Sequence, residues 1–179
     1  FVSMSAGNAG PGLGTTDHPS DDYIVVGATT TTGTLASGRL NVTGPGEVPD
    51  TLKGMAYGAA EFGASLPLAQ TISHTFKTSL AVDPANVLGC DPWEGEPFTG
   101  KAALVKRGDC DFSLKVYNAQ EGGAEFAIVY NRAGDGLINM AAGEHAADVT
   151  IPSIFIGQTA GEAMEAWYTT NGDASTLEV

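Results

Sequence analysis

The sequence has few basic residues. Its 179 residues contain 8 Lys and Arg against 21 Asp and Glu, which leaves a formal charge of −13 at pH 7. A protein that binds nucleic acid needs a cationic face for the phosphates, and anionic membrane surfaces also attract basic segments. The charge balance therefore excludes nucleic acid and argues against a membrane surface as partners.

Long apolar runs and zinc-binding patterns are also missing. No stretch approaches the ~18 consecutive apolar residues that a transmembrane helix needs. The two cysteines and three histidines form no cluster with the spacing of zinc ligands. The chain starts at Phe1 and opens with neither a basic nor a long apolar stretch, so we expect no signal peptide at its start and a piece of a longer protein.

Hydrophobic residues make up 42 % of the chain, and 24 residues are glycine. This composition predicts a real core built from strands that are joined by tight turns. Residues 1–50 alternate strand-like pieces with Gly-, Pro- and Asp-rich loops, and the breaker cluster at 44–50 is a plausible domain boundary. Residues 55–62 and 71–80 are candidate strands in the next zone.

Residues 100–177 have the clearest pattern. Apolar strands are predicted at 102–105 and 126–130, with a helix at 111–120 between them whose Lys115 and Glu121 can face water. A strand, a helix and a strand at this spacing predict parallel strands. A further strand at 151–156 and an amphipathic helix at 159–169, with Trp167 on its apolar side, follow.

Several loop residues could carry a site. His145 is close in sequence to Glu144 and Asp148. It is therefore a candidate metal ligand or general base, with an ordinary surface histidine as the alternative. Trp93 either offers an exposed ring to a peptide or packs beside Cys90. We expect no cofactor. The alternative is a calcium ion, which prefers carboxylate oxygens in loops and could be bound by four aspartates: Asp109, Asp111, Asp135 and Asp173.

The segment Ser5-Ala6-Gly7-Asn8-Ala9-Gly10-Pro11, with the strand-like residues 23–29 after it, resembles the oxyanion-hole segment of subtilisin-like serine proteases. The resemblance implies that Asn8 is the oxyanion-hole residue of a parent protease. The alternative is that Gly7-Asn8 is a tight turn. The family's catalytic Asp, His and Ser motifs do not occur in the chain, which argues against an enzyme in its own right.

Residues 100–112, Gly-Lys-Ala-Ala-Leu-Val-Lys-Arg-Gly-Asp-Cys-Asp-Phe, resemble a protease-associated (PA) domain, and the likeness continues at 128–131 and 150–154. It implies a mixed α and β (α+β) fold, a PA-type β-sandwich or open β-barrel with flanking helices, over residues 51–179. Residues 1–50 would then be a remnant of the protease core. PA domains also resemble inserts in zinc aminopeptidases and sorting receptors, against which the oxyanion-like segment argues.

The PA resemblance also implies that Cys90 and Cys110 pair as a disulfide, with two buried free thiols as the alternative. A disulfide indicates an oxidising compartment, so we expect the protein to be secreted or extracellular.

The function implied is that of a non-catalytic PA domain in a secreted subtilisin-like serine endopeptidase. It would bind a polypeptide substrate or the parent catalytic domain and control access to the active site. The candidate peptide-binding residues are Trp93, Asp135, Asn139 and His145. The alternative is a structural spacer or dimerisation insert without a ligand, in which the chain pairs with a second copy.

Overall fold

The computed structural model describes residues 3–5, 24–26, 36–67 and 70–179, and the chain divides into compact units at 1–33 and 34–179. In the first unit, β1 (Ser3–Ser5) and β2 (Ile24–Val26) pair in parallel. Both strands lie within residues 1–50, where the sequence predicts strand-like pieces, and β2 falls within the strand-like residues 23–29.

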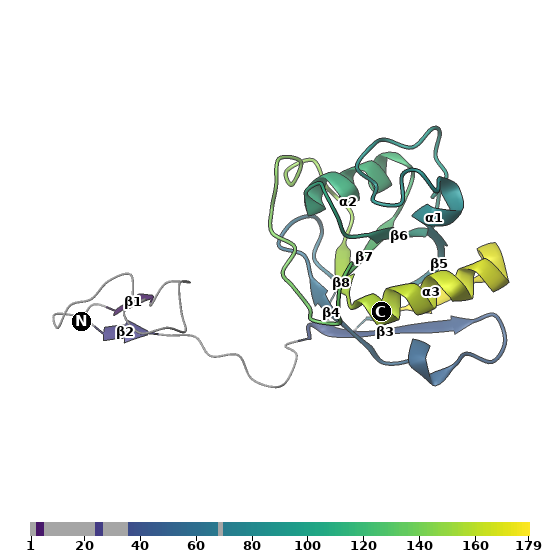
Figure 1. Cartoon of the computed structure of the whole chain (residues 1–179), viewed down its shortest axis with the longest axis horizontal. Helices are drawn as coiled ribbons and strands as arrows, with labels where there is room; N and C mark the ends of the chain where they lie inside the picture. Colours follow the sequence, from purple (N-terminus) through teal and green to yellow (C-terminus); the bar gives the residue numbers. More distant parts are fainter. Residues whose placement is uncertain (1–2, 6–23, 27–35, 68–69) are drawn as a thin grey trace. The chain divides into compact units, whose positions relative to one another are not determined.

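Seven strands of the second unit close into a barrel in the order β3-β4-β8-β7-β6-β5-β9 (Figure 1). The mixed α and β fold predicted from the sequence, with a β-barrel and flanking helices, is confirmed, and the barrel is closed. The strands are β3 (Gly38–Gly44), β4 (Met55–Ala59), β5 (Ser73–Thr78), β6 (Ala102–Lys106), β7 (Phe126–Tyr130), β8 (Ser153–Ile156) and β9 (Thr176–Glu178).

The strand β3 belongs to this barrel. The compact unit therefore begins before residue 38, whereas the sequence suggested a domain boundary near residue 50. It pairs with β4 at one end and with β9 at the other, both antiparallel. Leu40 and Val42 are fully or almost fully buried in the core. The breaker cluster at 44–50 is therefore a connection inside the second unit, leading to a short 3₁₀ helix at Asp50–Leu52.

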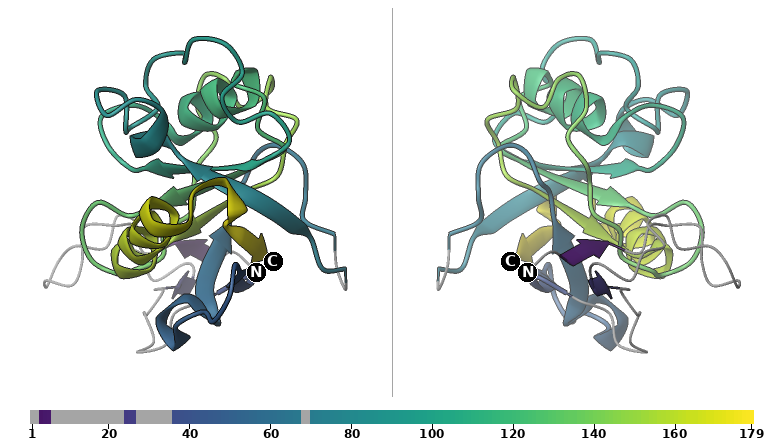
Figure 2. Two further views of the ribbon diagram at one scale, coloured as in Figure 1. Left: turned by 90° about the vertical axis from the view of Figure 1, so that its right-hand side faces the viewer. Right: turned by 90° about the vertical axis from the view of Figure 1, so that its left-hand side faces the viewer.

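The predicted strand, helix and strand unit is confirmed. β6 and β7 are parallel neighbours, and α2 (Phe112–Glu121) connects them. The second long helix, α3 (Gln158–Asn171), follows β8, which is parallel to β7. Figure 2 shows the parallel strands between α2 and α3.

Two apolar layers follow from the alternation of side chains along the strands. Along β7, Phe126 and Ile128 join the cluster that includes Met164 of α3, whereas Ala127 and Val129 join the cluster that includes Val116 of α2. Both faces of β7 are thus covered, which explains its uninterrupted apolar sequence.

The strand expected at 71–80 is shorter than predicted. β5 ends at Thr78, whose Oγ1 accepts a hydrogen bond from the Ala81 backbone N–H at 3.2 Å and caps the short helix α1 (Ser79–Val82). A threonine is a good N-cap because its hydroxyl satisfies a helix N–H that has no other partner.

Candidate functional site

A cavity of about 300 Å³ lies where β6 ends and α2 begins. Because β6 and β7 are parallel, with Lys106 opposite Tyr130, the residues that follow the two strands meet at one edge of the sheet. Ligands of parallel sheets characteristically bind outside this edge. The cavity is lined by Arg107, Gly108, Asp109, Cys110, Asp111, Phe112 and Arg132.

Arg107 is held in place by its neighbours. Its backbone N–H donates to the Tyr130 carbonyl at 2.9 Å, and its Nη1 donates to Asn131 Oδ1 at 3.0 Å. Asn131 is itself buried, and its Nδ2 donates to the Gly136 carbonyl. The guanidinium carbon lies 6.0 Å from the centre of the Phe112 ring. Arg107 is therefore oriented before any ligand arrives, which lowers the entropic cost of binding.

The loop between β6 and α2 also contains backbone strain. Asp109 has a φ of 47°. Among the described residues it is the one non-glycine residue whose φ is positive. Such a conformation costs free energy and persists only where surrounding contacts impose it, often at functional sites. Here the neighbouring Cys110 is fixed by a disulfide to Cys90, with 5.7 Å between the two Cα atoms. The predicted disulfide is confirmed.

Lys115 lies beneath this loop and is fully buried, whereas the sequence predicted that it faces water. Its Nζ donates to the Leu88 carbonyl at 2.7 Å and lies 3.2 Å from Cys110 Sγ and 3.5 Å from Cys90 Sγ. Burial lowers the pKa of Lys115 to about 8, and the charge of Asp109 opposes this shift in part. The prediction was wrong because the loop before β6 covers this side of α2.

The charges of the cavity are mixed. Arg107 and Arg132 are two of the chain's eight basic residues, and the exposed Asp109 and Asp111 stand beside them. Arginine donates hydrogen bonds in a fixed planar fork, while carboxylates only accept them. The cavity therefore offers a ligand both hydrogen-bond donors and hydrogen-bond acceptors. This pair of arginines was not predicted from the sequence, although each arginine closely follows a predicted parallel strand.

The four predicted peptide-binding residues have other contacts. Trp93 is only 9 % exposed, and its ring packs edge-to-face on Phe98 with centroids 4.9 Å apart. This is the packing alternative, since a buried ring cannot grip a peptide. The ring of His145 stacks on Tyr117 at 4.7 Å, and its Nδ1 lies 3.5 Å from Asp148 Oδ2.

Asp135 and Asn139 contact different elements. Asp135 accepts hydrogen bonds from the backbone N–H and the hydroxyl of Thr159 at 2.7 and 2.8 Å, and so caps the start of α3. Asn139 Nδ2 donates to Glu61 Oε1 at 3.0 Å. Neither residue lines the cavity beside Arg107. Asn8 lies outside the described residues.

The aspartates considered for calcium are not gathered at one place. Asp109 and Asp111 share the cavity, Asp135 caps α3, and Asp173 accepts a hydrogen bond from the Tyr168 hydroxyl at 2.6 Å. That hydrogen bond lowers the pKa of Asp173. Among the described residues, no group of three or more His, Cys, Asp and Glu side chains is placed to hold a metal ion.

None of the helices in the described part of the chain combines the length and the apolar character that crossing a membrane requires.

Comparison with known proteins gives one family match. The family model described as the PA domain matches residues 76–164. The E3 ubiquitin-protein ligase Godzilla of Drosophila melanogaster is 36 % identical over 117 residues, which are 62 % of this chain and 21 % of that protein. The E3 ubiquitin-protein ligase ZNRF4 of Macaca fascicularis is 40 % identical over 89 residues, 46 % of this chain and 20 % of that protein. The chain thus spans about a fifth of these relatives' length.

Two solved structures with a similar fold are aminopeptidases. The aminopeptidase from Aneurinibacillus sp. strain AM-1 has a TM-score of 0.56 at 22 % identity, over 82 % of this chain and 31 % of that one. The zinc aminopeptidase BSAP from Bacillus subtilis has a TM-score of 0.56 at 21 % identity, over 79 % and 29 %. At this identity the likeness shows the fold alone.

The predicted parent, a subtilisin-like serine protease, is wrong. The curated relatives Godzilla, ZNRF4 and RNF13 are E3 ubiquitin-protein ligases. The prediction that the parent is a serine-protease hydrolase is therefore wrong as well. The prediction relied on residues 5–11, a short Gly- and Asn-containing segment of a kind that also forms ordinary turns.

Proposed function

Because residues 76–164 are a PA domain, we propose that this chain is a non-catalytic protein-interaction domain that binds an extended polypeptide segment in the cavity beside Arg107. The observation that carries the proposal is the meeting of Arg107 and Arg132 with Asp109 and Asp111. A polypeptide main chain offers carbonyl acceptors to the arginines and N–H donors to the carboxylates.

The architecture of the cavity supports this role. Arg107 is oriented by Asn131 and Tyr130, and the disulfide and Lys115 hold the loop that carries Asp109. A preorganised site loses little conformational freedom when it binds. The surrounding charge of −13 further favours segments that are not strongly acidic.

The relatives suggest the setting in which such a domain works. They are E3 ubiquitin-protein ligases, and this chain spans about a fifth of their length. We propose that the chain chooses a protein partner for an activity carried by another part of a longer protein. We further propose that it works in an oxidising compartment, outside the cell or in the secretory route, because its disulfide persists there.

Binding of an unfolded polypeptide tests the proposal. Reduced and alkylated casein is titrated into the oxidised chain, and the affinity is measured by calorimetry. Arg107→Ala is expected to weaken binding about tenfold, as is typical when a hydrogen-bonded charged group is lost. Arg107→Lys keeps the charge but not the planar fork, so an intermediate loss is expected.

Arg39→Ala is the matched control, because Arg39 is exposed on β3 and its Nη1 donates to the neighbouring Gly38 carbonyl. Equal losses for Arg107→Ala and Arg39→Ala would show a general charge effect and contradict the proposed site. No binding by the unaltered chain would favour the alternative of a spacer or dimerisation domain, which analytical ultracentrifugation then tests.

A further inference from the structure

The disulfide has a buried ammonium group beside it. The Nζ of Lys115 lies 3.2 Å from Cys110 Sγ and 3.5 Å from Cys90 Sγ. An ammonium group carries three N–H donors, whereas a sulfur atom is only a weak acceptor. Within the described part of the chain, the Leu88 carbonyl is the one oxygen that accepts a hydrogen bond from this Nζ. The other two donors therefore face the sulfurs.

The charge of Lys115 has no counter-ion among the described residues. The side chain is fully buried, and it forms no ion pair with a described carboxylate. Because its pKa is about 8, the group is charged at pH 7. A buried charge without a partner costs free energy. A thiolate at either cysteine would supply the missing negative charge, and only reduction of the disulfide produces one.

Cys110 offers a route to the disulfide. It lines the cavity beside Arg107, and both cysteines retain some exposure to solvent. Cys90 does not line that cavity. A thiol that enters the cavity thus meets Cys110 first, and Cys90 is then the leaving group.

The charged side chains around the disulfide also favour a thiolate. Those that line the cavity or contact the sulfurs are three cations and two carboxylates: Arg107, Arg132, Lys115, Asp109 and Asp111. Positive surroundings lower the pKa of a thiol and make its thiolate a better leaving group. Lys115 is the cation that contacts both sulfurs, so it should have the largest effect.

We propose that the disulfide between Cys90 and Cys110 is an exchange site for thiols, with Lys115 stabilising the thiolate that leaves. An entering thiolate attacks Cys110 Sγ and forms a mixed disulfide. The bond to Cys90 breaks, and its electron pair stays on Cys90 Sγ as a thiolate beside the ammonium group. A second thiolate then attacks the outer sulfur of the mixed disulfide and releases Cys110. Two thiols are oxidised to one disulfide, and of their two protons one goes to Cys110 and the other to solvent.

Exchange at this site is expected to control the cavity. The disulfide fixes Cys110 next to Asp109, whose backbone has a positive φ. Such a conformation persists only while surrounding contacts impose it. Opening the disulfide should therefore relax the loop and weaken binding in the cavity. This control of binding rests on the proposed function, whereas the exchange chemistry does not.

The exchange equilibrium is measured without denaturant in buffers of reduced and oxidised glutathione. Free thiols are alkylated and counted by intact mass, since the chain has only two cysteines. Lys115→Met is expected to lower the equilibrium constant for reduction about tenfold, or about 30 mV, because the thiolate loses its counter-ion. A disulfide that glutathione reduces only in urea would overturn the proposal.

Asn118→Ala is the matched control. Asn118 is buried on the same helix, and its Nδ2 donates to the Gly89 carbonyl at 2.9 Å. Its loss loosens the same loop without removing a charge, so the equilibrium constant should change less than about threefold. Equal shifts for Lys115→Met and Asn118→Ala would show an effect of loop stability and overturn the role of the ammonium group.

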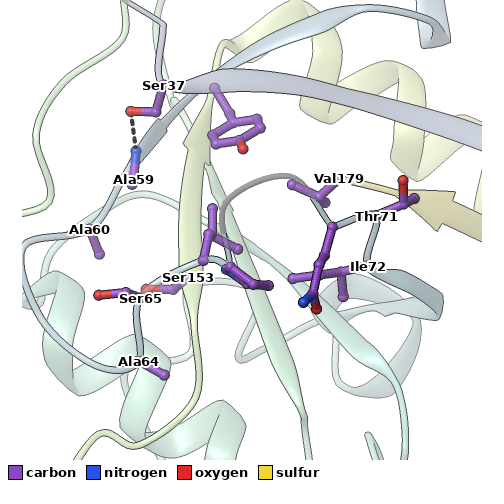
Figure 3. A pocket seen from close by; sticks show the side chains of 13 residues that line it. Ser37, Ala59, Ala60, Ala64, Ser65, Thr71, Ile72, Ser153 and Val179 are labelled. Carbon is purple, nitrogen blue, oxygen red and sulfur yellow. Dashed lines mark hydrogen bonds between the residues drawn. The ribbon is translucent and has the colours of Figure 1, made fainter.

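A second measurement keeps Lys115 in place and so does not depend on the folding of that variant. The ionisation of the reduced chain is followed by the ultraviolet absorbance of the thiolate. The reference thiol is Ser65→Cys in the oxidised chain, because Ser65 is exposed and lines another cavity without a charged side chain among its described lining residues (Figure 3). The first thiol of the reduced pair is expected to ionise about one pH unit below the reference. Ionisation at the same pH would contradict the proposal.

Control of the cavity has its own arm. Reduced and alkylated casein is titrated into the oxidised chain and into the chain held reduced by dithiothreitol. The reduced chain is expected to bind about fivefold more weakly, because its loop is no longer preorganised. Equal affinities would overturn the control of binding. Absence of casein binding by the oxidised chain would count against the proposed function alone, since the glutathione equilibrium is measured without casein.

Discussion

The two long helices cover opposite faces of the same strands by different means. α3 packs through an apolar side on which Met164 is fully buried and Trp167 is partly buried. The indole Nε1 of Trp167 donates to the Gly44 carbonyl at 3.1 Å. α2 buries polar side chains as well: Lys115 donates to Leu88, and Asn118 donates to the Gly89 carbonyl at 2.9 Å. An apolar stripe thus fixes α3, while the main chain of a disulfide-linked loop fixes α2.

The largest effect is expected from removing Lys115, the buried polar side chain that connects α2 to the disulfide-linked loop. Lys115→Ala removes a buried side chain and leaves the Leu88 carbonyl without its partner. The expected loss in the free energy of unfolding is about 3 kcal/mol. Urea denaturation measures it. Lys53→Ala is the control, because Lys53 forms an exposed ion pair with Asp50 and its loss should cost under about 0.5 kcal/mol. Equal effects would contradict the role assigned to Lys115.

The close packing of α3 is tested at Gly161. A Cβ at this position would overlap Cγ of Tyr130, so Gly161→Ala must displace the helix or the ring. We expect a loss of about 2 kcal/mol, typical of an overpacked core. Gly136→Ala is the matched control, because a Cβ there meets nothing within 4 Å. Thermal unfolding should show a lower Tm for the first variant and little change for the second.

The starts of the two helices also differ. Asp135 caps α3 from a neighbouring loop, whereas the side chain of Asp111 makes no capping hydrogen bond at the start of α2. Asp135→Ala should therefore cost about 1 kcal/mol, the usual value of a lost cap. Asp111→Ala should cost less. Amide hydrogen exchange in the first turn of each helix gives the local readout, and the reverse order would refute the comparison.

The two helices should also differ in the direction of their pH dependence, through Lys115 on α2 and Tyr168 on α3. Burial lowers the pKa of Lys115 to about 8 in the folded chain, from 10.5 when unfolded. Between about pH 8 and pH 10 the unfolded chain binds more protons, so stability rises with pH. Above this window the raised pKa values of Tyr130 and Tyr168 act in the opposite direction. Lys115→Met should flatten the rise in urea midpoints, and an unchanged rise would contradict this assignment.

The same contrast explains what the sequence could predict. α3 and the parallel strands were foreseen because a single apolar period defines them, as with Trp167 on its predicted apolar side. Lys115 was misplaced because a lysine between apolar positions has the same pattern whether it faces water or a covering loop. The confirmed pairing of Cys90 with Cys110 was the available signal that a loop lies over this end of α2.

The candidate site was harder to predict than the fold. Arg107 and Arg132 are 25 positions apart, and only the parallel register of β6 and β7 brings them to one cavity. Trp93 and His145 stood out as residue types, yet each is held by a ring, Phe98 and Tyr117 respectively. Burial of this kind depends on tertiary packing, which a single sequence does not encode locally.

Closure of the barrel has a consequence for the order of folding. β9, at Thr176–Glu178, is the strand that joins β3 to β5, and it pairs with both. Thr43 of β3 and Thr176 of β9 are 133 positions apart in the sequence, so β3 is synthesised long before this partner strand. Such high contact order slows folding and leaves strand edges open to other chains in the meantime. Until β9 is made, β3 and β5 therefore lack the strand that joins them at this seam of the barrel.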